Sequence, residues 1–165
     1  MTLSQASASL RLSATVDPAD PLSSGTYELG GGSSLYSFPD ANQVYTGKVS
    51  NLDSTGDINI KTATANLPVG TVISGLGGED ADGAAVDLSE IYGLKIKNLG
   101  ADDLAVEVSS WTGSNPMVEF GNVPPGGELI VVDPAGRPIT LCSLDFAPGG
   151  QDGAFEIAVI GKTSA

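Results

Sequence analysis

Short apolar segments separated by glycine- and proline-rich turns are the feature that most constrains how this chain folds. From Ser34 onward these segments recur at the spacing expected of an all-β sandwich or barrel. The composition agrees, because 22 glycines, 10 prolines and only 5% aromatic residues are typical of many short strands joined by turns. No stretch of about ten residues has a helical period with capping signals, apart from a candidate single turn at 87–92.

We expect the segments to form one all-β domain of two antiparallel sheets packed face to face. A jelly roll fits their number and length best, although an immunoglobulin-like sandwich has the same kind of pattern and the sequence leaves it open. The predicted strands are 35–38, 44–49, 57–63, 71–74, 92–97, 104–109, 117–120, 129–133, 139–144 and 155–160.

The beginning of the chain has a different character. Residues 9–16 read S-L-R-L-S-A-T-V, an alternation that places Leu10, Leu12, Ala14 and Val16 on one face of a strand. Two prolines and a run of three glycines then oppose continued strand pairing. We therefore divide the chain into an N-terminal arm with its linker, 1–33, and a β-sandwich domain, 34–165.

The charge balance excludes several kinds of partner. Seven lysines and arginines stand against 20 acidic residues, a net charge of −13, and no basic cluster is present to follow a nucleic-acid backbone. The same charge repels anionic lipid, and the longest aliphatic runs are far too short to span a bilayer. The opening residues lack the basic and apolar parts of a secretory signal, so we expect synthesis in a cytoplasm.

The residues needed for most catalysis are also missing. The chain has no histidine, and no nucleotide-binding or nucleophile-elbow motif occurs in a suitable context. A glycosidase carboxylate pair is disfavoured because few aromatic residues are present to hold a sugar. We expect a non-enzymatic protein with no cofactor, metal or small-molecule substrate. Cys142, the single cysteine, is expected to be a small buried core residue.

Three surface features are candidates for contacts. The acidic run within 79–90 imitates part of a calcium loop, but its spacing fails at the first and last ligands, so a solvated loop is expected, with an interface cation as the alternative. Trp111, in an expected turn, is either an interface anchor or a cap on the core. Arg137, in the D-P-A-G-R-P turn, is either an ordinary surface residue or a partner for an acid on another subunit.

Four segments occur in an order that resembles one protein family. They are D-A-N-Q-V-Y (40–45), G-L-K-I-K-N-L-G-A-D-D-L-A-V-E-V (93–108), N-V-P-P-G-G-E-L-I-V-V-D-P-A-G (122–136) and A-F-E-I-A-V-I-G (154–161). A strand ending in Asn, a PGG before an aliphatic strand and a closing strand ending in Ile-Gly resemble small structural proteins of tailed bacteriophages. The resemblance covers the chain from Asp40 onward and leaves the arm unaccounted for.

This resemblance implies a virion protein, and small β-sandwich proteins of virions often resemble capsid decoration, or cement, proteins that assemble as trimers. The implied partners are the major capsid protein and two further copies of the chain. The implied location is the capsid surface, after synthesis in the host bacterial cytoplasm. In this interpretation the apolar face of the arm (Leu10, Leu12, Ala14 and Val16) adds a strand to a capsid subunit.

Two other interpretations stay open. A tail, head-fibre or adhesin component would also be a β-rich trimer, but it would have to recognise a host sugar or protein. A non-viral β-sandwich binding module would be expected to carry an export signal, and none is visible.

Overall fold

A computed structural model describes residues 6–8, 36–38, 43–76, 86–115 and 120–163. All its strands pair in antiparallel ladders, and the described residues contain no helix. The strands are β1 (Ala6–Ala8), β2 (Tyr36–Phe38), β3 (Gln43–Leu52), β4 (Gly56–Asn59), β5 (Thr64–Asn66), β6 (Val72–Ser74), β7 (Leu88–Asn98), β8 (Leu104–Gly113), β9 (Asn122–Val123), β10 (Glu128–Pro148) and β11 (Gly153–Thr163). The predicted all-β class is thus confirmed.

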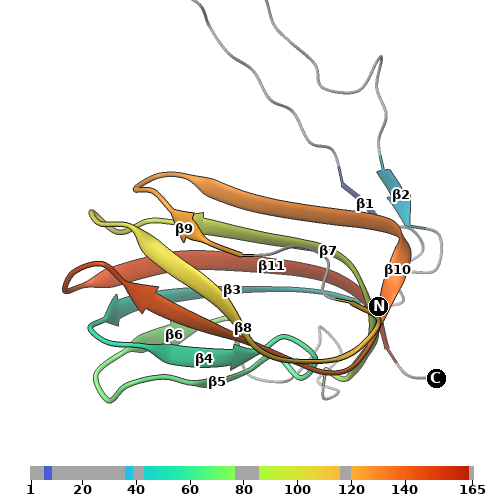
Figure 1. Cartoon of the computed structure of the whole chain (residues 1–165), viewed down its shortest axis with the longest axis horizontal. Coiled ribbons are helices and arrows are strands. Elements are labelled where there is room, and N and C mark those ends of the chain that lie inside the picture. Colours follow the sequence, from blue (N-terminus) through green and yellow to red (C-terminus); the bar gives the residue numbers. More distant parts are fainter. Residues whose placement is uncertain (1–5, 9–35, 39–42, 77–85, 116–119, 164–165) are drawn as a thin grey trace, which may run out of the picture.

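The strands build one curled sheet in the order β5-β4-β10-β7-β11-β3-β6 (Figure 1). Outside this order, β8 pairs with β10 on one side and with β9 on the other. The long strand β10 determines the curl. Its first half pairs with β7, whereas its second half pairs with β8 and β4. One strand therefore belongs to two parts of the sheet.

The core lies inside the curl. Alternating residues of β3, β7, β8, β10 and β11 are buried there, as period-2 strands require. Phe146 on the second half of β10 stacks on Phe155 of β11, with ring centroids 4.3 Å apart and planes 9° from parallel. These two strands are not paired with each other, so the stack is a side-chain contact inside the curl. Cys142 is buried in this core, as expected from the sequence.

One buried polar residue, Asn98, fixes the loops at one end of the sheet. Its Nδ2 donates to the carbonyls of Asp102 at 2.7 Å and Val123 at 2.8 Å, and its Oδ1 accepts from Gly100 N at 2.8 Å. Its backbone N donates a hydrogen bond to the carbonyl of Gly127, and its backbone carbonyl accepts one from Gly126 N. Asn98 therefore ties the N-L-G-A-D-D and N-V-P-P-G-G loops together, with every side-chain polar atom satisfied.

Several predicted boundaries are wrong. The candidate helical turn at 87–92 is the start of β7, and the expected turn containing Trp111 is part of β8. The segments 129–133 and 139–144 form one strand, β10, because the proline-glycine run between them makes a bulge and not a reversal. The strand predicted at 57–63 ends at Asn59, and that predicted at 117–120 lies largely outside the described residues.

The N-terminal strands form a small separate ribbon. β1 pairs with β2 in an antiparallel ladder, with Ala6 opposite Phe38 and Ala8 opposite Tyr36. The predicted strand at 9–16 lies outside the described residues, so the extended arm stays a prediction.

Candidate functional site

The bulge in β10 is the candidate site, because it contains Arg137 and lies where the N-terminal ribbon meets the sheet. Val132 stands opposite Gly93 of β7, and Arg137 stands opposite Ile91. The stretch 133–136 is therefore opposed by Tyr92 alone. Such bulges bend a strand and redirect its side chains.

Local chemistry explains why the pairing breaks here. Pro134 has no amide hydrogen for the ladder. Asp133 Oδ1 accepts a hydrogen bond from Ala135 N at 3.0 Å, which stabilises a turn-like backbone. Gly136 has φ +77, a conformation in which side chains are strained. Each of these features favours a break in the hydrogen-bonded ladder between β10 and β7.

Tyr92 packs beneath the bulge. It is buried, and its hydroxyl donates to Glu90 Oε2 at 2.7 Å. A Cβ placed on Gly136 would lie 2.8 Å from Tyr92 Cζ, so glycine lets the chain cross the ring closely. The bulge is thus a packed feature supported from below by an aromatic ring.

Arg137 is held at the surface of the bulge. Its Nε lies 2.5 Å from Asp133 Oδ2, and the two side chains are 39% and 18% exposed. The contact is an ion pair and not a directional hydrogen bond, since Arg137 Nε has no hydrogen-bond partner in the described part of the chain. At this exposure the pair is expected to contribute about 1 kcal/mol or less to stability.

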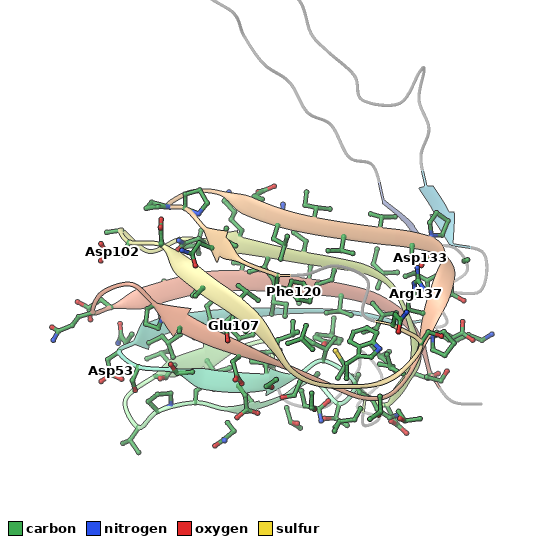
Figure 2. All side chains as sticks on the ribbon, viewed as in Figure 1. Asp53, Asp102, Glu107, Phe120, Asp133 and Arg137 are labelled. Carbon is green, nitrogen blue, oxygen red and sulfur yellow. The ribbon has the colours of Figure 1, made fainter. Side chains whose placement is uncertain are left out.

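The N-terminal ribbon lies against this bulge. β2 contacts β10, and Figure 2 shows Asp133 and Arg137 close to the place where β1 and β2 reach the sheet. Leu10, Leu12, Ala14 and Val16 lie outside the described residues, and their role stays a prediction.

Trp111 of β8 stands opposite Cys142, farther along β10. Its ring packs against the core cluster, and its Nε1 donates to Ser114 O. Burial of Cys142 raises the pKa of that thiol to about 12. Trp111 therefore packs against the core, whereas the side chain of Arg137 is partly exposed at the surface. An interface role for either residue stays a prediction.

The acidic run is described only in part. Asp87 forms an ion pair with Lys61, and residues 77–85 lie outside the described ranges. Among the residues that the structure describes, no three His, Cys, Asp or Glu side chains are arranged to hold a metal ion. The expectation of a solvated loop is left untested.

Sequence reasoning missed two charged surfaces on the outside of the sheet. Lys95 and Lys97 flank buried Ile96, so their alternation does predict a common outward face. Their alignment with Lys48 of β3 depends on the order of the strands in the sheet. The alternation of apolar and polar residues does not predict that order. The same holds for three acids on β4, β8 and β10 that come together only through the ladder register.

Comparison of the chain with protein-family models, with curated proteins and with solved structures gave no match. In the described part of the chain, no segment is a helix capable of crossing a lipid bilayer.

Proposed function

We propose that the chain is a non-enzymatic structural protein that binds the outer surface of a tailed-phage capsid and stabilises it as a decoration protein. The proposed partners are the major capsid protein and two further copies of the chain. The proposed location is the assembled virion.

The observation that carries this proposal is where the resembling segments fall. Three of the four lie in β7 with β8, in β9 with β10, and in β11. Strands β10, β7 and β11 are neighbours at the centre of the sheet, and the Asn and PGG motifs meet at Asn98. Segments separated in sequence thus build one structural unit, as expected if their order reflects a shared fold.

We further propose that the curled sheet is a jelly-roll-like sandwich. The stack of Phe146 on Phe155 between unpaired strands supports two facing layers. A sandwich of this kind is rigid, which suits a protein that reinforces a shell already built.

The N-terminal ribbon supports the proposed mode of attachment. β1 and β2 join the body beside the β10 bulge, so a segment leaving the ribbon can extend along a neighbouring subunit. Strand addition gives main-chain hydrogen bonds without a deep pocket. Several copies attached together would strengthen individually modest contacts through avidity.

Co-sedimentation tests the proposal. The purified chain is mixed with phage heads that lack it and, in parallel, with isolated tails. Saturable binding to heads alone is the expected result. Binding to tails would favour a tail or fibre component, and binding to neither would contradict a virion role.

A further inference from the structure

The outer face of the sheet carries a patch rich in lysine. Glu128 of β10, Lys97 of β7, Glu156 of β11 and Lys48 of β3 occupy one row across four paired strands. Lys95 lies one outward position along β7. We call Lys48, Lys95 and Lys97 the lysine face; they are three of the six lysine and arginine side chains that the structure describes.

Two residues of the lysine face border a hollow of about 310 Å³. Lys48, Lys95 and Glu156 line it together with the small residues Gly47 and Ala158. Glu128 Oε1 lies 3.0 Å from Lys95 Nζ and 3.7 Å from Lys97 Nζ, whereas Lys48 forms no ion pair within the described residues. The face can therefore receive an additional acidic group.

A second surface, on the other part of the sheet, has the opposite character. Asp145 of β10 stands directly opposite Asp57 of β4 on one side and Glu107 of β8 on the other. We call these three residues the acidic row; Glu107 is labelled in Figure 2. Outward side chains directly opposite on paired strands have Cβ atoms about 5 Å apart, and like charges there are destabilising.

No lysine or arginine of the described residues forms an ion pair with the acidic row. Asn66 and Ser143 donate hydrogen bonds to Asp57, at 2.8 Å and 3.3 Å. Asp145 and Glu107 have no hydrogen bond or ion pair to their carboxylates among the described residues. The row thus costs the isolated chain stability, and a cationic surface would remove that cost.

We propose that the lysine face of one copy binds the acidic row of a second copy. Both surfaces are on the outside of the curled sheet. The lysine face lies beside the first half of β10, and the acidic row crosses its second half. The acids occupy three consecutive strands, and Lys97 and Lys48 are two strands apart with Glu156 between them, so the spacing of the two outer acids, Asp57 and Glu107, matches that of these two lysines.

This contact is heterologous, because two different surfaces of the same chain meet. Repeating it gives a closed ring when the rotation closes and an open stack when it does not. The inference goes beyond capsid attachment and does not require it. It assigns specific side chains to the contact between copies.

Paired neutral variants test this inference. One variant replaces the acidic row (D57N, E107Q and D145N), and the other replaces the lysine face (K48Q, K95Q and K97Q). Sedimentation velocity is measured over a range of chain concentrations in about 0.1 M salt, where the Debye length is about 10 Å. The unmodified chain is expected to form species larger than a monomer, and each variant alone is expected to stay monomeric.

Mixing the two variants gives the decisive result. Each retains the surface that the other lacks, so an equimolar mixture is expected to form a species with the mass of two chains and no larger one. Thermal melts of both variants verify that they remain folded. A monomeric unmodified chain, association of either variant alone, or a monomeric mixture would each overturn the inference.

A charge-matched control separates the contact from overall repulsion. Neutralising the acidic row changes the net charge from −13 to −10, which by itself favours association. The control D53N, D103N and D152N makes the same change on exposed loop residues and is expected to associate as the unmodified chain does. Loss of association in this control would also overturn the inference. Head binding is measured separately, so failure here leaves the capsid proposal to its own test.

Discussion

The two ends of the β7–β10 ladder are built on different principles. At one end, Asn98 is buried and its side chain bonds two loops with no polar atom unsatisfied. At the other end, four residues of β10 stand against Tyr92 alone, and a surface ion pair takes the place of ladder bonds. The N-terminal ribbon lies at this second end.

The difference indicates that the two ends of the ladder have different roles. The Asn98 end gains stability from buried hydrogen bonds, which are costly to break. The bulge end interrupts the ladder with an aspartate, a proline, a glycine and a partly exposed arginine. We therefore expect substitutions at the first end to lower stability most. Under the proposed function, removing the Arg137 side chain at the second end should affect attachment more than folding.

The largest effect is expected from Asn98→Ala. The substitution leaves the carbonyls of Asp102 and Val123 without their donor, and each unsatisfied buried group costs about 1–3 kcal/mol. The free energy of unfolding should fall by about 3 kcal/mol in urea denaturation. Asn66→Ala, which removes one exposed hydrogen bond, should change it by less than about 0.5 kcal/mol. Equal losses of unfolding free energy in the two variants would show that the buried hydrogen bonds of Asn98 contribute no more than one exposed hydrogen bond.

A smaller effect is expected from Gly136→Ala in the bulge. The new Cβ meets both a positive φ and the ring of Tyr92, so the free energy of unfolding should fall by about 2 kcal/mol. Gly126→Ala is the matched control, because Gly126 has φ +70 but no atom within 4 Å of the position that an added Cβ would occupy. It should lose only about 1 kcal/mol. If both lose the same amount, the contact with Tyr92 is unimportant.

Arg137→Ala should change stability less than either Asn98→Ala or Gly136→Ala. An ion pair of this exposure contributes about 1 kcal/mol or less, and that contribution should fall further in high salt. Under the proposed function, the variant should nevertheless bind phage heads more weakly than the unmodified chain. A large loss of stability with unchanged head binding would reverse the assigned roles of the two ends.

Deleting residues 1–20 should leave the unfolding transition of the body unchanged. The core cluster runs from Tyr45 to Val159, so the deletion removes none of these residues. Attachment to heads should weaken, because the predicted capsid-binding strand is lost. Circular dichroism with co-sedimentation checks both points, and an unfolded deletion product would refute the idea of a separable arm.

Alkaline pH tests whether the interior around Cys142 and Tyr45 is closed to solvent at neutral pH. Burial raises the pKa of Cys142 to about 12 and that of Tyr45 well above its usual value of 10.0. The unfolded chain loses these protons first, so stability should be unaffected below about pH 8 and should fall as the pH rises toward about 12. Thiol labelling of the folded chain at about pH 8 should be much slower than labelling of the unfolded chain. Equally rapid labelling would show that Cys142 is accessible.

The fold class is predictable from the sequence because alternation and turn residues are local signals. The segments 104–109 and 155–160 lie inside β8 and β11, since their apolar residues repeat every second position. The proline-glycine run at 133–138 predicts a turn because the same residues favour a reversal and a bulge, and only the pairing with β7 decides between them.

The site is less predictable than the fold. Arg137 stands out in the sequence because cations are rare, but its pairing with Asp133 requires the bulge geometry. The serine, threonine and glycine around Trp111 favour a turn, whereas tertiary pairing with β10 extends β8 through this segment. The acidic row is invisible in the sequence because its three members come from strands far apart along the chain.

The most direct test of the proposed function is the temperature at which phage heads release their DNA. Heads lacking the chain are measured alone and after saturation with the purified chain, with isolated tails added to a third sample as a control. The decoration proposal predicts a higher release temperature for the saturated heads and no change with tails. An unchanged release temperature despite saturable binding would contradict a stabilising role.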